Sequence, residues 1–366
     1  MLRAGIVGLP NVGKSTLFNA LTAQASALAV NYPFATSKSN VGVVAVPDDR
    51  LPPLAKLVKT DTVVPATVEF IDIAGLVRGS SKGEGLGNQF LVNIRESDTM
   101  VQVVRCFEDD EIVHVEGSID PKRDIETIQI ELALADLASV ERRRERTQKA
   151  AKSGDKTARG ELEILDKLQP ALEDFRPARS VPLTEEDRAI VRGFFLLTTK
   201  PTIYAANVDE GTLAGTSANG YVEAVRQVAE SEGAECVVIC AQLEADLVAL
   251  APEERLDYLK SLGVTSTGVD SLIQGAYRQL GLMSFLTAGE KEVRAWTIPQ
   301  GTRAQQAAGA IHSDLERGFI RAEVINYERL MSAGSYAAAR DQGLLRLEGK
   351  DYIMQEGDVV HFRFNV

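Results

Sequence analysis

Runs of apolar residues along the first two thirds of the chain predict the strands of one sheet. They cover residues 3–9, 66–73, 99–107, 201–206 and 236–241, and several are apolar almost throughout. Strands that are covered on both faces of a parallel sheet show this pattern. Stretches with helical character lie between them, which predicts a doubly wound α/β fold.

The stretch from about 124 to 196 interrupts this alternation. Two apolar stripes recur at spacings of three and four, namely Ile125, Ile128, Leu132 and Ala135, then Leu162, Leu165, Leu168, Leu172 and Phe175. Such spacing predicts two helices, and the turn-rich residues 152–156 separate them. We expect an antiparallel helical hairpin, inserted into the α/β domain, whose apolar stripes pack on each other.

The last segment, 283–366, has a different pattern. A glycine-punctuated start precedes a helical stretch near 303–316, and strand-like residues such as 359–364 lie at the end. These features predict a small α+β domain. The expected organisation is a domain over 1–282, interrupted by the hairpin at 124–196, and a second domain over 283–366.

Charge limits the kinds of partner. The formal net charge of the 366 residues is −12, so no overall basic field draws nucleic acid to the protein. The exception is the expected hairpin tip, residues 142–159, with eight basic and two acidic residues. This basic arm fits either a solvated helix end or a local contact with RNA phosphates, and both readings stay open.

The cysteine pattern and the N-terminal residues indicate the cellular compartment of the protein. Three cysteines without a CxxC pair are typical of a reduced, intracellular protein. The N-terminus runs into a strand without the features of a signal peptide, and no apolar run is long enough to span a bilayer. We expect a cytoplasmic protein without a membrane partner.

The segment from Gly8 to Ser15 matches the P-loop pattern GxxxxGK[ST] between a predicted strand and a predicted helix. Its glycines let backbone N–H groups face phosphate oxygens, and the helix directs its N-terminal dipole at the same anion. Lys14 would reach the β- and γ-phosphates, and Ser15 would coordinate Mg²⁺. The sequence therefore predicts a nucleoside-triphosphate site with Mg²⁺ as cofactor.

Two further motifs follow in the order of a GTPase-like switch domain. Asp72 and Gly75 form a DxxG, in which Asp72 would approach Mg²⁺ through water and the Gly75 amide would meet the γ-phosphate. Thr36 is placed to close over Mg²⁺ when the γ-phosphate is present. Leu76 occupies the position of the water-orienting Gln of Ras-like enzymes. Since leucine cannot orient a water, we expect slow hydrolysis, with Lys14, Thr36 and Gly75 in catalytic roles.

The segment 207–210 indicates which nucleotide base the site would recognise. Guanine-specific domains of this type have Asn-Lys-x-Asp, whose Asp accepts two hydrogen bonds from guanine. Here Val208 replaces the Lys, and Glu210, one methylene longer, replaces the Asp. This argues against strict guanine specificity, while Asn207 is expected to contact the purine at N7 or to pack on its ring. The alternative is that 207–210 is only a turn.

With these motifs assembled, the chain resembles the Obg-like ATPase family, of the bacterial YchF type, over nearly its whole length. The matching stretches are GLPNVGKSTLFNALT from Gly8, NYPFAT from Asn31, DIAGLVRGSSKGEGLGNQF from Asp72, RCFEDDEIVHVEGSIDP from Arg105, NVDE from Asn207 and AWTIPQGTRAQQAAGAIHSDLERGFIRAEV from Ala295. The resemblance implies a P-loop G domain, an inserted helical hairpin and a C-terminal TGS domain, a ubiquitin-like β-grasp module. It also implies ATP preference over GTP, association with the ribosome or its large subunit, and a link to translation and stress responses.

The family pattern also implies roles for individual residues. Those that would hold the triphosphate are Asn11, Val12, Gly13, Lys14, Ser15 and Thr16. Ser15 and Thr36 would serve Mg²⁺, the backbone around Val208 would border adenine, and Asn11 sits where related GTPases bind K⁺. The chain departs from the pattern at 37–39 and at Ser81, where some relatives have a His, so a His-assisted step cannot apply here.

Three functions are compatible with these observations. The leading one is a slow, monomeric ATPase switch that docks on ribosomes, with the basic arm touching RNA. The second is a GTPase in ribosome assembly, and the third is an RNA-binding module in which the nucleotide is structural. His114 is expected to be structural, because no nucleophile motif accompanies it.

Overall fold

The computed structural model describes residues 2–28, 40–73, 86–215, 218–264 and 266–365. Contacts divide the chain into two compact units, the first made of 1–44 and 69–275 and the second of 45–68 and 276–366. The domain boundary predicted from the sequence, near 282, places the segment 45–68 in the first domain. Its place in the second unit is therefore a difference from the expected organisation.

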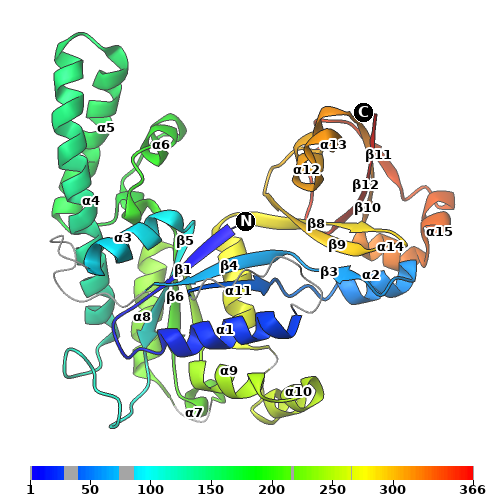
Figure 1. Ribbon diagram of the computed structural model, residues 1–366, viewed down its shortest axis with the longest axis horizontal. Coiled ribbons are helices and arrows are strands. Elements are labelled where there is room, and N and C mark those ends of the chain that lie inside the picture. The colour runs from blue at the N-terminus through cyan, green and yellow to red at the C-terminus, as the bar shows by residue number, and fades with distance from the viewer. Residues whose placement is uncertain (1, 29–39, 74–85, 216–217, 265, 366) are drawn as a thin grey trace. The chain divides into compact units, whose positions relative to one another are not determined.

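The first unit contains a six-stranded sheet in the order β2-β4-β1-β5-β6-β7 (Figure 1). In chain order the strands are β1 (Leu2–Val7), β2 (Val41–Ala45), β4 (Thr67–Asp72), β5 (Thr99–Arg105), β6 (Thr202–Asn207) and β7 (Glu235–Ile239). The neighbours β1, β5, β6 and β7 pair in parallel. Every residue of β5 and β6 is buried, as their apolar runs predict for central strands. Five of these strands were predicted, and β2 was not.

Helices follow the strands of this sheet in alternation. They are α1 (Lys14–Leu28), α3 (Leu86–Glu96), α7 (Glu210–Leu213), α8 (Gly220–Glu232), α9 (Ala241–Val248), α10 (Pro252–Ser261) and α11 (Gly268–Gln279). α1 packs beside α9, and α8 packs on β6 and β7. Because the parallel strands end at the same edge, the loops after β1, β5, β6 and β7 meet there.

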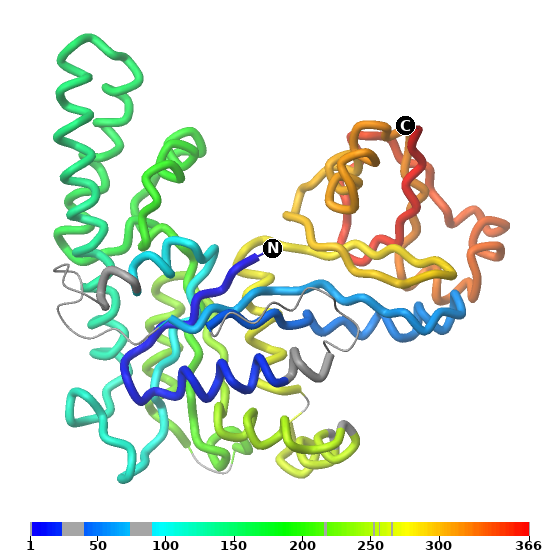
Figure 2. Tube along the Cα trace, in the orientation of Figure 1, coloured from blue at the N-terminus to red at the C-terminus, as the bar shows by residue number. Residues whose placement is uncertain are grey.

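The predicted hairpin is present as α4 (Pro121–Lys152) and α5 (Lys156–Glu173), which pack along each other (Figure 2). Asp120 and Asp155 cap their N-termini by accepting backbone N–H groups. The prediction is wrong at Phe175, which follows the end of α5, has a positive φ of 57° and is exposed. The chain returns to β6 through α6 (Glu185–Arg192) and two 3₁₀ turns, Ala178–Ser180 and Leu197–Thr199.

The second unit has its own six-stranded sheet, in the order β11-β10-β12-β8-β9-β3. Its elements are α2 (Leu51–Val58), β3 (Val63–Val64), β8 (Leu282–Ala288), β9 (Val293–Pro299), α12 (Ala304–Ile311), α13 (Ser313–Arg317), β10 (Phe319–Asn326), α14 (Tyr327–Ala333), α15 (Tyr336–Asp341), β11 (Arg346–Glu348) and β12 (Asp358–Phe364). Alanines of α12 pack against Phe285 and Phe362 of the sheet. This is the α+β pattern expected, except that the helical stretch near 303–316 is broken in two at His312, whose backbone is extended.

The segment 45–68 is bound to the rest of the second unit at several points. β3 pairs in parallel with β9, and the hydroxyl of Thr60 donates to the carbonyl of Lys291 at 3.2 Å. Arg50 pairs with Glu356 at 2.6 Å, while Asp48 holds the other side of the guanidinium. The segment is thus an integral part of this unit.

Candidate nucleotide-binding site

The P-loop joins β1 to α1, where the sequence motif predicts it. Asn11 (φ 61°) and Gly13 (φ 95°) have left-handed backbone conformations that turn the loop. A Cβ atom at Gly13 would lie 2.3 Å from Nδ2 of Asn207. Glycine is therefore required at position 13 both by its φ angle and by the close approach of a side chain from β6.

Lys14, Ser15 and Asp72 form a polar cluster at the start of α1. Lys14 is 7% exposed, and its Nζ donates to the carbonyl of Leu9 at 2.5 Å. Burial lowers the pKa of Lys14 to about 8, against the opposing effect of the Asp72 charge. Burial also raises the pKa of Asp72, partly offset by Lys14 and by a hydrogen bond from Ser15. Residues predicted from separate motifs are thus brought together.

The same cluster is suited to a divalent cation. Mg²⁺ prefers oxygen donors and is commonly held by one or two protein oxygens together with substrate phosphates. The Ser15 hydroxyl and the Asp72 carboxylate are such donors and lie within hydrogen-bond distance of each other. Over the described ranges, no group of three or more His, Cys, Asp or Glu side chains is arranged to hold a metal. The residues present therefore fit Mg²⁺ when it arrives with a nucleotide.

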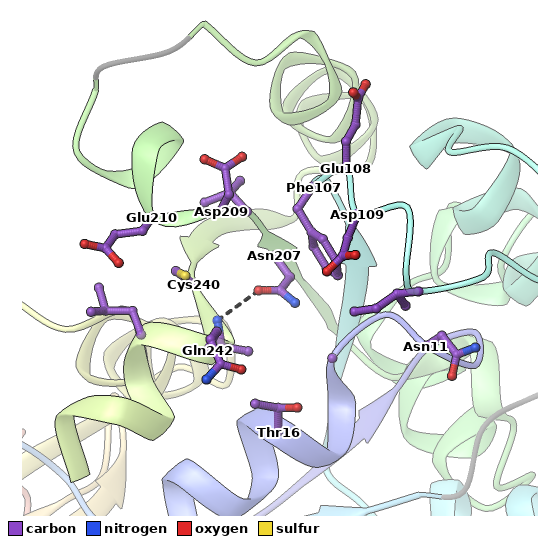
Figure 3. A pocket seen from close by; sticks show the side chains of 15 residues that line it. Asn11, Thr16, Phe107, Glu108, Asp109, Asn207, Asp209, Glu210, Cys240 and Gln242 are labelled. Atoms are coloured by element: carbon purple, nitrogen blue, oxygen red, sulfur yellow. Dashed lines mark hydrogen bonds between the residues drawn. The ribbon is translucent and has the colours of Figure 1, made fainter. Parts of the chain in front are cut away.

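A pocket of about 500 Å³ lies beside the P-loop (Figure 3). Its lining residues come from four segments that follow β1, β5, β6 and β7 or end those strands: Asn11, Gly13, Thr16, Phe107, Glu108, Asp109, Ile112, Asn207, Val208, Asp209, Glu210, Cys240, Ala241, Gln242 and Leu243. Pockets of 300–1,000 Å³ accommodate small-molecule ligands. The pocket brings predicted triphosphate residues and predicted base residues to one cavity at the carboxyl edge of the sheet.

Asn207 connects the two halves of this pocket. Its Nδ2 donates to the carbonyl of Val12 in the P-loop at 2.9 Å. Its Oδ1 accepts from the backbone N–H of Ala241 at 2.9 Å, the bond drawn in Figure 3. The side chain is buried. These two bonds connect the P-loop to the start of α9, a role that the sequence did not indicate. The contact of Asn207 with a purine stays a prediction.

The rest of the segment 207–210 links a strand to a helix and is not an isolated turn. The side chain of Val208 is buried in the core, so only its backbone is available to the pocket. Asp209 caps α7 by accepting the N–H of Thr212 at 2.8 Å. One oxygen of Glu210 accepts the hydroxyl of Tyr258, in α10, at 2.9 Å. The Glu210 carboxylate is therefore partly engaged before any ligand enters.

One wall of the pocket was missed by sequence reasoning. It is the loop after β5, from which Phe107, Asp109 and Ile112 reach the pocket. Phe107 and Asp109 lie opposite Glu210 and Cys240 (Figure 3). In the sequence, this stretch stands out only as part of the motif shared with the Obg-like family. A usable signal was present, because an aromatic residue and several carboxylates follow directly after a buried strand that neighbours β1 and β6.

Comparison with known proteins finds relatives that match this chain over its whole length. A curated relative, the ribosome-binding ATPase YchF of Bacillus subtilis (strain 168), is 54% identical over 365 residues, covering 100% of both chains. This chain belongs to the YchF family. YchF of Escherichia coli O157:H7, also named a ribosome-binding ATPase, is 52% identical over 364 residues, covering 100% of this chain and 99% of its own.

Two family models match separate parts of the YchF chain, and a solved structure matches nearly all of it. Residues 282–365 match the model YchF-GTPase_C, described as a protein of unknown function, and residues 3–141 match the model described as a 50S ribosome-binding GTPase. The structure of the Schizosaccharomyces pombe YchF GTPase has a TM-score of 0.89 and 38% identity, covering 99% of this chain and 97% of its own. The predicted P-loop GTPase-like fold is confirmed.

The remaining candidate residues of this YchF chain have different outcomes. His114 is structural, as predicted: it is buried, its Nε2 lies 2.9 Å from an oxygen of Asp124, and its Nδ1 accepts the N–H of Glu116 at 3.1 Å. Because Nδ1 accepts, the proton is on Nε2, which donates to Asp124. The predicted roles of Thr36, Gly75, Leu76 and Ser81 fall outside the described residues.

Proposed function

We propose that this YchF-family protein is a slow, Mg²⁺-dependent nucleoside triphosphatase that prefers ATP to GTP and acts as a conformational switch on the ribosome or its large subunit. The observation that carries the proposal is the single pocket that joins P-loop residues Asn11, Gly13 and Thr16 to the end of β6. A triphosphate at the P-loop would place its base in that pocket. The curated relatives are named ribosome-binding ATPases.

The preference for adenine rests on Glu210. Guanine recognition needs a carboxylate with two acceptors free for N1–H and the 2-amino group. One oxygen of Glu210 already accepts the Tyr258 hydroxyl, and the extra methylene displaces the group. Relatives are named both ATPase and GTPase, so nucleotide competition is the direct test. GTP binding tighter than ATP by tenfold or more, about 1.4 kcal/mol, would favour the GTPase in ribosome assembly instead.

Hydrolysis is assigned to the phosphate side of the pocket. Lys14 would neutralise the β- and γ-phosphates, Ser15 and Asp72 would hold Mg²⁺, and Mg²⁺ when bound supplies charge neutralisation of the phosphate oxygens. We place Thr36 at the same metal and the Gly75 amide at the γ-phosphate. Lys14→Ala is expected to abolish turnover, measured as phosphate release under saturating ATP. Undiminished turnover in this variant would remove the P-loop from the mechanism.

Cation dependence is a separate question for the same assay. Asn11 has a left-handed backbone conformation in the P-loop, and its Nδ2 donates to the carbonyl of Val113 at 3.0 Å. Its side-chain Oδ1 is the atom that we propose for K⁺. Turnover should then be several-fold faster in K⁺ than in Na⁺, and equal rates in the two salts would rule out a K⁺ site.

Ribosome contact is assigned to the basic arm 142–159, and the structure shows which of its charges are available. Arg143 pairs with Glu161 at 2.6 Å, and Arg144 pairs with Asp166 at 2.7 Å. Arg142 forms no ion pair among the described residues, but its Nε donates to the carbonyl of Ala138 at 3.0 Å. Over the described chain, five other basic residues of the arm are exposed, and their side chains form neither an ion pair nor a hydrogen bond: Arg146, Lys149, Lys152, Lys156 and Arg159. These five are the charges that RNA phosphates would meet.

Ribosome pelleting can test the arm with a matched control. Replacing those five residues by Gln should reduce co-sedimentation strongly at low salt, whereas replacing the paired Arg143 and Arg144 should reduce it less. Binding that survives five substitutions and high salt would exclude the arm as the electrostatic contact. Binding that is independent of nucleotide state and of Lys14 would favour an RNA-binding module with structural nucleotide.

The cellular setting follows from the proposed partner. A ribosome-bound switch would work in the cytoplasm, and we propose that it works as a monomer, which sedimentation of the free protein would test. None of the helices in the described ranges is long and apolar enough to cross a membrane.

A further inference from the structure

Arg105 has unusual surroundings for a charged side chain. It is the last residue of β5, it is 2% exposed, and it is among the largest fully buried side chains of the protein. In the described part of the chain, its guanidinium bonds to backbone carbonyls and forms no ion pair with a carboxylate. A buried charge is costly unless hydrogen bonds compensate it, so these carbonyl contacts need a reason.

All three contacts go to the loop that follows β5. Nε donates to the carbonyl of Phe107 at 3.2 Å, one terminal nitrogen donates to that of Ile112 at 2.8 Å, and the other to that of Asp109 at 3.1 Å. The guanidinium also lies over the Phe107 ring, 4.6 Å from its centroid. A planar fork with donors on every nitrogen suits this arrangement, and an ammonium group cannot reproduce it.

The three residues held by Arg105 all reach the pocket, together with their neighbour Glu108. Phe107, Asp109 and Ile112 line the cavity, and Phe107 and Asp109 lie on the side opposite Glu210 (Figure 3). Arg105 itself is paired in register with Asn207 on the neighbouring strand, and it is absent from the pocket lining. It can therefore affect a ligand only through the position of the loop.

We propose that Arg105 is a positioning residue for the base-side wall of the nucleotide pocket. By gathering three carbonyls around one guanidinium, it fixes the loop 107–112 in the shape that receives the nucleoside, without touching the phosphates. The proposal rests on the proposed function, since it assumes that the pocket holds a nucleoside triphosphate. Loss of Arg105 should then weaken recognition of the nucleoside and leave recognition of the triphosphate intact.

The test compares ATP with inorganic tripolyphosphate as ligands of the full chain, each measured by calorimetry. Arg105→Lys should weaken ATP binding about tenfold or more and leave tripolyphosphate binding within twofold of the wild type. In turnover assays KM for ATP should rise while kcat at saturation stays within twofold. Arg105→Gln, which keeps two donors, serves as a second variant in case the lysine variant does not fold.

Arg179→Lys is the control, because Arg179 is a half-buried guanidinium that pairs with Glu232 at 2.7 Å and does not line this pocket. It should change neither ligand's affinity. Equal loss of ATP and tripolyphosphate binding in the Arg105 variants, or unchanged ATP binding, would refute the positioning role. Wild-type protein that binds tripolyphosphate but not ATP would instead refute the proposed function, so the two failures are distinguishable.

Discussion

Glu244 gives the sharpest prediction about pH. It lies in α9, is 1% exposed, and accepts the backbone N–H groups of Gly268 and Val269 at 2.6 and 3.3 Å through Oε1. Among the residues that the structure describes, its buried Oε2 has no hydrogen-bond partner. Burial raises the pKa of Glu244 from 4.5 to about 7; the two backbone amides act in the opposite direction, and Asp270 adds to the rise. The perturbation that isolates this group is Glu244→Gln.

The magnitude follows from the pKa difference. One pKa unit corresponds to about 1.4 kcal/mol, so the rise from 4.5 to about 7 is worth roughly 3 kcal/mol. Below pH 4.5 the carboxyl is protonated in both folded and unfolded chains, and its contribution to stability is fully present. As the pH rises from 4.5 to about 7, the unfolded chain ionises while the folded chain still holds the proton, so this contribution is lost by the time the pH has passed through 7.

The assay is chemical denaturation of wild type and Glu244→Gln at pH 5 and pH 8. The quantity measured is the free energy of unfolding of the first unit, which contains Glu244. The amide can still accept both backbone N–H groups and carries no buried charge. The variant should therefore gain up to about 3 kcal/mol over wild type between these pH values. A leucine at the same position would leave both N–H groups unpaired, at about 1–3 kcal/mol each, at either pH. A pH-independent difference between wild type and Glu244→Gln would refute the reasoning.

Three further substitutions have definite expected outcomes. Gly13→Ala forces a methyl group into a contact of 2.3 Å at a φ of 95°, and ATP affinity should fall at least about tenfold in calorimetry. Asp136→Ala removes the acceptor of three buried donors in 197–198, which should cost about 3 kcal/mol or more of stability in denaturation, with asparagine as the milder control. Tyr258→Phe removes the hydroxyl that donates to Glu210. Nucleotide competition should then show GTP affinity rising a few-fold relative to ATP affinity, and an unchanged ratio would mean that Tyr258 does not set the preference through Glu210.

The sequence predicts those features that depend on local pattern. The buried strands β5 and β6 are continuous apolar runs, and the P-loop residues follow one another in the chain, so spacing alone places Lys14 and Ser15. The helical stripes of the hairpin are equally local. Their one error, Phe175, arises because hydrophobicity does not show where a helix ends; the chain turns at a left-handed residue, and the ring is left exposed.

The features that were missed depend on contacts between distant residues. Phe107 becomes part of the pocket only because β5 lies between β1 and β6 in the sheet. Asn207 is drawn to Val12 across 195 positions of sequence, which no local pattern encodes. The engagement of Glu210 by Tyr258 likewise needs α10 to fold back on the end of β6.

The contribution of 45–68 to the second unit has a consequence for synthesis of the protein. This segment leaves the ribosome exit tunnel early, whereas its partners, β9, Lys291 and Glu356, are made more than 200 residues later. Nascent chains generally fold from the N-terminus onward. The first unit can therefore fold before the partners of 45–68 in the second unit have been synthesised. A fragment that begins at residue 282 would lack α2 and β3 and would expose the edge of β9 that β3 covers. The sheet of the second unit is therefore complete only after its last strand, β12, has been translated.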